Sequence, residues 1–185
     1  MQGAFIQAHT YKSPTILGRQ LLPFSPWHGV ILEAAASPYI LGGIPKLDDM
    51  ILGVWVCSHS HADGWNAAAN APSAQEWGNS LTDPNFPAAL TAFDEYISAS
   101  FMGPEYWSSG GGSEIRAPYM WHLATFGMSY LHMSEVAAWD CSVAKLMCYH
   151  ACKAEVEGNK DLVSNEDMRG MEVLKKDEET SRKSK

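Results

Sequence analysis

Cysteine and histidine side chains are the residues of this chain that could bind a metal ion or form a covalent bond. They fall in two groups along the sequence: Cys57, His59 and His61, and Cys141, Cys148, His150 and Cys152. Structural zinc needs four Cys or His donors, normally including a close cysteine pair from a turn, whereas Cys148 and Cys152 lie in an apolar helical stripe. The sequence therefore predicts no metal site, and it leaves open whether the two groups meet in space.

A cysteine beside a histidine could also act as a nucleophile with its general base. Cys57 with His59 or His61 offers this pairing, because a thiolate near an imidazole is the minimum for thiol catalysis. Neighbouring positions in a helix or turn do not make two side chains face each other, and no third orienting residue or recognisable local sequence accompanies them. We therefore predict no catalytic residue and no cofactor. His28 and His122 are interpreted as helix residues with a polar tip at the surface.

Composition limits the class of protein. A chain of 185 residues is long enough for one hydrophobic core, and 46% apolar against 18% charged residues is typical of a globular domain. The net charge of -8 argues against nucleic-acid binding, which depends on Lys and Arg. No apolar run approaches the roughly 20 residues that span a bilayer. Three cysteines on one predicted helix are poorly placed for a disulfide, so we expect free thiols and a cytoplasmic protein.

The segment from Ser134 to Gly158 has the longest helical pattern. Ser134 is suited to cap a helix N-terminus and Gly158 to end the helix. Apolar residues recur at helical spacing along one face, which other helices must cover. These residues are Val136, Trp139, Val143, Met147, Ala151 and Ala154, widened by Ala137, Cys141, Ala144, Cys148 and Cys152. We expect one continuous helix, packed on residues 51–56 and 123–131.

Four further segments have a helical pattern. Ser25 and Pro26 are typical of a helix start, and the apolar period that follows ends at Ser37-Pro38. A helix that begins at Asp48 or Asp49 and runs to Val56 is apolar nearly all round, so we place it at the centre of the fold. Residues 88–102 and 117–133 complete the set, and Gly127 should permit a close helix crossing.

The remaining segments lack a clear period. Residues 1–13 are interpreted as a short strand or an arm, residues 15–24 as at most one turn of helix, and residues 62–87 as a loop region with short helical pieces. The sequence thus predicts an all-α, single-domain bundle of about five principal helices over residues 1–174. A flexible loop at 108–113 and a charged, mobile tail at 175–185 accompany it.

One segment carries a family resemblance. Residues 17–39, LGRQLLPFSPWHGVILEAAASPY, followed by Val56-Cys57-Ser58, resemble small proteins encoded among the tail genes of long-tailed bacteriophages, in particular tail assembly chaperones. Ala117-Pro118-Tyr119 and the C-terminal helix pair lie in similar places. The resemblance implies a helical protein without catalytic residues, which coats the hydrophobic, helical tape-measure protein before the tail polymerises.

The amino-acid composition is compatible with such a role. The chain has seven Trp and nine Met, and adaptable Met-rich faces accept amphipathic helices. We expect a non-catalytic protein that binds a long helical partner through exposed apolar and aromatic side chains, and that self-associates through the same surface. A structural virion subunit is the first alternative, and a zinc-binding or thiol-dependent enzyme is a further one.

Overall fold

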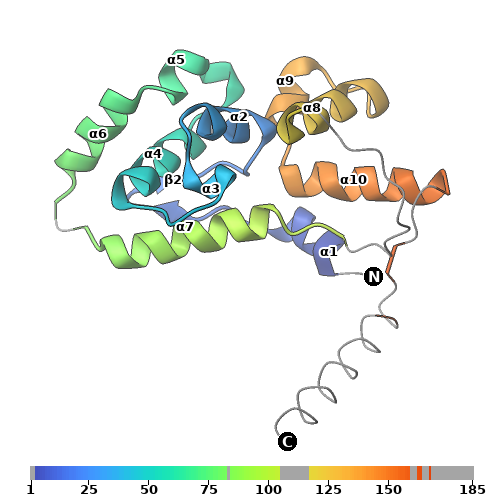
Figure 1. Ribbon diagram of the computed structural model, residues 1–185, viewed down its shortest axis with the longest axis horizontal. Helices are drawn as coiled ribbons and strands as arrows, with labels where there is room; N and C mark the ends of the chain where they lie inside the picture. The colour runs from blue at the N-terminus through green and yellow to red at the C-terminus, as the bar shows by residue number, and fades with distance from the viewer. Residues whose placement is uncertain (1–2, 83, 105–116, 159–161, 164–166, 168–185) are drawn as a thin grey trace, which may run out of the picture.

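The computed structural model describes residues 3–82, 84–104, 117–158, 162–163 and 167, which are mostly α-helical (Figure 1). In chain order, the elements are α1 (Gly3–Thr10), β1 (Thr15–Ile16), β2 (Arg19–Gln20), α2 (Pro26–Ala34), α3 (Pro38–Leu41), α4 (Leu47–Cys57), the 3-10 helix η1 (His61–Asp63), α5 (Trp65–Ala68), α6 (Ala71–Ser80), α7 (Phe86–Ser100), α8 (Tyr119–Tyr130), α9 (Glu135–Asp140) and α10 (Val143–Val156). The predominantly helical class is confirmed. The ten α-helices of the described residues exceed the predicted five, and the loop at 108–113 and the tail at 175–185 lie outside those residues.

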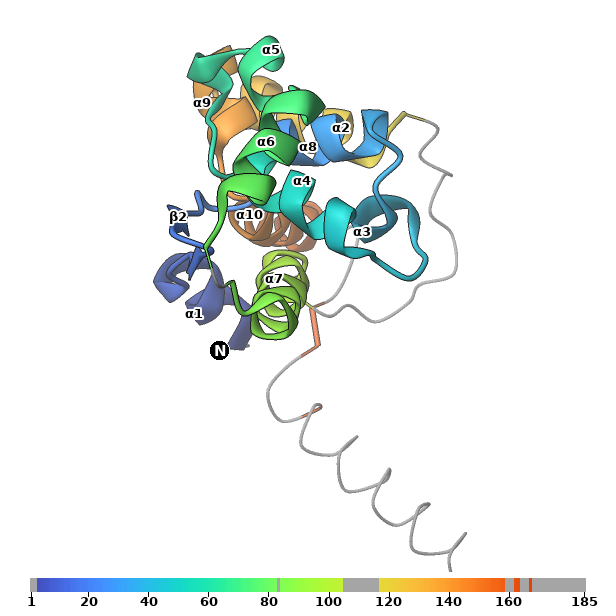
Figure 2. The same ribbon diagram turned by 90° about the vertical axis from the view of Figure 1, so that its left-hand side faces the viewer.

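Helix α4 lies at the centre of the core, as its apolar composition predicts. Met50, Val54 and Val56 are completely buried, and α4 packs against α2, α5, α6 and α7. Figure 2 shows α4 between α2 and α6 on one side and α7 on the other. Gly53 permits the approach of α7, because a Cβ at this position would lie 2.5 Å from Cζ of Phe93. The need to bury the apolar surface of α4 therefore determines where α2, α5, α6 and α7 lie.

The predicted helix from Ser134 to Gly158 has correct ends but is not continuous. The Ser134 hydroxyl accepts a hydrogen bond from the Ala137 amide at 3.3 Å, and Gly158 follows the end of α10 with a φ of 70°. Between these ends the chain leaves the helical conformation at Cys141 and Ser142, whose ψ angles are 138° and 131°. The expectation of one helix is therefore wrong, and two helices, α9 and α10, take its place.

Tertiary hydrogen bonds explain the break. The Val143 amide donates to the carbonyl oxygen of Phe24 at 2.8 Å, and the Asp140 carboxylate accepts from the His61 amide at 2.7 Å. The Val143 bond replaces the backbone bond that this amide would make in a continuous helix, and the Asp140 bond holds the end of α9 against η1. Helix α9 then packs on α2, η1 and α8, while α10 packs on α1, α7 and α8. Packing on residues 123–131 is confirmed, whereas residues 51–56 are not a principal neighbour of either helix.

The change of direction at Cys141 and Ser142 also alters the apolar face predicted for residues 134–158. Val136, expected to be inside, lies on α9 and is 49% exposed, and Cys152 is exposed near the end of α10. Leu146, which was not counted in the face, is completely buried. The predicted close crossing at Gly127 is present, because a Cβ there would lie 3.2 Å from the Cβ of Ala138. Thus α8, α9 and α10 form one closely packed group.

The N-terminal segments differ from expectation. Residues 3–10 form helix α1, whose buried Ala4 and Ala8 pack on α10, in place of a strand or an arm. The segment expected to form at most a turn of helix contains an antiparallel hairpin in which Thr15 pairs with Gln20. Leu17 and Gly18 have φ angles of 49° and 80°, as a two-residue type I′ turn requires. Leucine rarely adopts a positive φ, so the sequence did not indicate this turn.

The segment between the hairpin and α2 connects distant parts of the chain. The Leu22 amide donates to the carbonyl oxygen of Cys57 at 2.8 Å, and the Leu22 carbonyl oxygen accepts from the Tyr96 hydroxyl at 2.7 Å. One residue of this segment therefore joins the end of α4 to the middle of α7. Together with the bond from Val143 to Phe24, these contacts tie α4, α7 and α10 to the same short stretch of backbone.

The region 62–87, expected to be a loop with short helical pieces, contains more helix than predicted. Helix α6 alone has 10 residues, and it begins where the Asn70 side chain accepts from the Ser73 amide at 3.1 Å. The indole of Trp55 donates to the Ala67 carbonyl oxygen at 3.1 Å and lies 6.1 Å, between ring centres, from Trp77. These contacts hold α5 and α6 against α4.

The burial of α10 gives a direct test of the core. Leu146→Ala should lower the free energy of unfolding by about 2–5 kcal/mol, because it removes buried apolar atoms and leaves a cavity. Val156→Ala, on the same helix at a position that is 86% exposed, should change it by no more than about 0.5 kcal/mol. Urea denaturation measures both variants, and equal stabilities would show that α10 is not part of the core.

Candidate functional site

The surroundings of Cys57 do not favour the role of nucleophile that the thiol-enzyme alternative gives it. The thiol is completely buried at the end of α4. Burial, the largest effect, raises the pKa of Cys57 to about 12, while the hydrogen bond with Tyr96 acts in the opposite direction. A thiol with this pKa is protonated at neutral pH, and only the thiolate is an effective nucleophile. Cys57 is a core residue.

His59 and His61 make contacts that do not involve Cys57. The His59 Nδ1 donates to the Trp55 carbonyl oxygen at 2.7 Å. The His61 ring lies 4.7 Å from the Trp27 ring and 6.4 Å from the Trp139 ring, measured between ring centres. His59 therefore packs on Trp55 at the end of α4, whereas His61 lies in an aromatic cluster between α2 and α9. They are not paired with a thiol as a base would be.

The cysteines of the C-terminal helices are separated from one another. Cys141 is half-buried against the main core, and Cys148 is buried with Ala8 and Ala144 under α1, whereas Cys152 is exposed. Each of these cysteines, like Cys57, is a free thiol. Within the part of the chain that the structure describes, no three or more His, Cys, Asp or Glu side chains are grouped to hold a metal ion. The two predicted groups do not come together as one ligand set.

His28 was interpreted as a surface residue, and the structure corrects this. The imidazole is 1% exposed, and Nδ1 accepts a hydrogen bond from the Ser25 amide at 3.1 Å. Nε2 therefore carries the proton and donates to the His59 carbonyl oxygen at 2.8 Å. Burial, the largest effect, lowers the pKa of His28 to about 4. A Ser with a polar residue three positions later is the capping-box spacing, which could have indicated this role.

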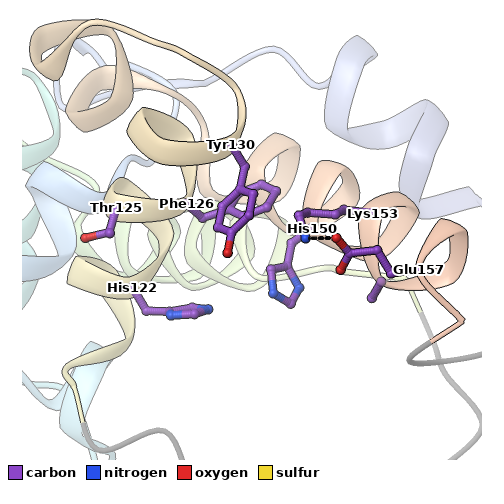
Figure 3. Close-up of a pocket in the computed structure, with 8 residues that line it drawn as sticks. His122, Thr125, Phe126, Tyr130, His150, Lys153 and Glu157 are labelled. Atoms are coloured by element: carbon purple, nitrogen blue, oxygen red, sulfur yellow. Dashed lines mark hydrogen bonds and ion pairs between the residues drawn. The ribbon is translucent and has the colours of Figure 1, made fainter.

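A cleft between α8 and α10 is lined by both polar and aromatic side chains. We call it the α8–α10 cleft; its volume is about 250 Å³, and it is lined by His122, Thr125, Phe126, Tyr130, His150, Lys153, Ala154 and Glu157. Figure 3 shows side chains from α8 on one side and from α10 on the other. Lys153 forms an ion pair with Glu157, and its Nζ lies 4.2 Å from the centre of the Tyr130 ring. The cleft thus combines aromatic rings with two imidazoles.

A larger groove, lined mostly by apolar and aromatic side chains, lies where α2, α3, the end of α7 and the start of α8 meet. We call it the apolar groove; its volume is about 410 Å³, and it is lined by Glu33, Tyr39, Ile40, Leu41, Phe101, Tyr119 and Met120. Glu33 is the charged residue in this lining. Burial, the largest effect, and the carboxylates of Asp94 and Asp49 raise the pKa of Tyr39. The surroundings of the groove are therefore both apolar and acidic.

Large apolar side chains continue from the apolar groove onto the surface. Leu41 is 59% exposed and Ile44, just beyond it, is 90% exposed, and Met102 and Tyr119 are also exposed. None of these four residues was predicted from the sequence to belong to a binding surface. The apolar run Tyr39-Ile40-Leu41 between Pro38 and Gly42 was the available signal, because apolar residues at a turn are unusual unless they are covered.

Comparisons of the chain with protein-family models, with curated protein sequences and with solved structures find no match. Among the described residues, no helix combines the length and the apolar character that a membrane span requires.

The buried imidazole of His28 makes the fold sensitive to acid. An unfolded histidine titrates near pH 6.5, whereas folded His28 titrates near pH 4, so between these values the unfolded state binds more protons. The contribution of His28 to the free energy of unfolding is fully present above pH 6.5 and is lost as the pH falls toward 4. By pH 4.5, the loss should reach about 2.5 kcal/mol of unfolding free energy.

The matched variant is His28→Gln, since glutamine suits this capping position but does not titrate. Urea denaturation at pH 7 and pH 4.5 should show a smaller acid-induced loss in His28→Gln than in the parent protein. His132→Gln, at an exposed histidine, should lose as much as the parent. The same loss in all three proteins would show that His28 is not the group responsible.

Proposed function

We propose that this protein is a non-catalytic binding protein that accepts an amphipathic helix of a partner protein in the apolar groove. The observation that supports this most is the apolar groove itself, with the exposed Leu41 and Ile44 at its margin. Contiguous exposed apolar surface is uncommon on a protein without a partner. Helices bind such grooves through apolar side chains spaced three and four residues apart.

Charge complementarity favours one kind of helix. Glu33 lines the apolar groove, and Asp49 and Asp94 lie close enough to Tyr39 to raise its pKa. No Lys or Arg lines the groove among the described residues. A partner helix with Lys or Arg beside its apolar face would gain favourable interactions with these carboxylates, whereas an acidic helix would be repelled.

The biological role that we propose is that of a tail assembly chaperone of a long-tailed bacteriophage, with the tape-measure protein as partner. Support comes from the resemblance of residues 17–39, because Glu33 and Tyr39 of the apolar groove belong to that segment. A tape-measure protein is long, helical and hydrophobic. Covering its apolar faces before assembly requires a binding surface and no chemistry.

Charged substitutions in the apolar groove test the proposal. The protein is co-expressed with the tape-measure protein of the same genome, and the soluble partner is measured. Leu41→Lys and Tyr119→Lys should each weaken binding about tenfold, equivalent to about 1.4 kcal/mol, because each places a charge on the apolar surface that the partner must cover. Both positions are exposed, so the fold should be retained.

Val156→Lys is the control, since it makes the same change at an exposed position on α10, outside the groove lining. Normal binding by the groove variants would remove the groove from the proposal. A partner that is equally soluble alone and never co-purifies would refute the chaperone role and favour a structural virion subunit. Dimers of this chain that Leu41→Lys dissociates would identify a second copy as the occupant.

A further inference from the structure

The α8–α10 cleft contains two imidazoles from different helices whose separation suits a shared metal ion. His122 on α8 and His150 on α10 lie 5.6 Å apart between ring centres, with their planes at 71°. Figure 3 shows the two rings next to each other at the opening between the helices. His122 Nε2 is shielded from solvent and has no hydrogen-bond partner among the described residues.

We propose that His122 and His150 form a two-histidine site for a late divalent transition metal ion of the Ni²⁺, Cu²⁺ or Zn²⁺ class. This proposal is independent of the helix-binding function, because the α8–α10 cleft and the apolar groove share no lining residue. Neutral imidazole nitrogen is a preferred ligand of these ions, and either ring nitrogen can bind.

The distance between the His122 and His150 rings agrees with that of two imidazoles bound to one metal ion. With a metal–nitrogen bond of about 2.0–2.1 Å, the ion lies about 3.2 Å from the centre of each ring. Two rings that share an ion are therefore about 5.2 Å apart at a tetrahedral angle and about 6.4 Å apart at the linear limit. The observed 5.6 Å lies between these limits and corresponds to a nitrogen–metal–nitrogen angle of about 120°.

The other charged groups of the cleft leave room for the ion. Lys153 would repel a cation, but its positive charge is offset by the ion pair with the Glu157 carboxylate and by the contact with the face of the Tyr130 ring. Because no third His, Cys, Asp or Glu joins the pair among the described residues, water completes the coordination. Such a site connects α8 to α10, and a bound ion should stabilise the protein in proportion to its affinity.

The test uses the full-length protein without an affinity tag and with Cys152→Ser, since the exposed Cys152 thiol could bind metal itself. Titration calorimetry with NiCl₂ should show one saturable equivalent, and MgCl₂ should show none, because Mg²⁺ prefers oxygen ligands. The melting temperature should rise with Ni²⁺ concentration. His122→Asn and His150→Asn should each weaken binding by about tenfold or more and abolish the rise.

His132→Asn is the matched control, because His132 is exposed with a φ of 53° that asparagine tolerates. It should bind Ni²⁺ as the parent does. If an asparagine variant fails to fold without metal, His122→Phe or His150→Phe keeps an aromatic ring and removes the ligand. No saturable binding up to about 1 mM Ni²⁺, or equal affinity in the His122, His150 and His132 variants, would overturn the site.

Discussion

Hydrogen bonds from the short segment Leu22–His28 hold the fold together, and the other helices depend on them. Four bonds join this segment to three separate regions: Cys57 and His59 at and just beyond the end of α4, Tyr96 in α7, and Val143 at the start of α10. Phe24, Cys57 and Val143 are buried, and the bonds of His28 to His59 and of Tyr96 to Leu22 are partly buried, where an unpaired polar group would be costly. The position of each of these regions is therefore specified by a backbone or imidazole partner in the same few residues, in addition to apolar packing.

The two concave surfaces follow from this arrangement. Helix α2 continues directly from the segment and carries Glu33 to the apolar groove, where α3 and the start of α8 meet it. The bond from Val143 to Phe24 starts α10 in a new direction, and α10 then lies along α8 with the cleft between them. The same hydrogen bonds that close the core thus determine which apolar and polar side chains remain at the surface and face one another.

Local signals explain what the sequence could predict. Ser25 and Pro26 marked the start of α2, and the regular apolar spacing of residues 88–102 marked α7. The break at Cys141 has no Gly or Pro because tertiary hydrogen bonds produce it, and the turn at Leu17 places an unusual residue at a positive φ. The start of α6 at Asn70-Ala71-Pro72 did carry capping signals, but they were interpreted as loop composition. The apolar groove could not be predicted, because its residues come from helices far apart in the sequence. The packing of residues 134–158 on 123–131 was predicted, but the cleft was not, because it depends on the new direction that α10 takes after Cys141.

Hydrogen exchange of the complex with the helical partner tests the central claim, that the apolar groove is the binding surface. Amide exchange reports local opening and should slow where the partner covers the backbone. We expect slower exchange in α3 (Pro38–Leu41) and in the first turn of α8 at Tyr119, with no change in α6 (Ala71–Ser80), which contributes nothing to the groove lining. Slower exchange confined to α6, or to the α8–α10 cleft, would contradict the account.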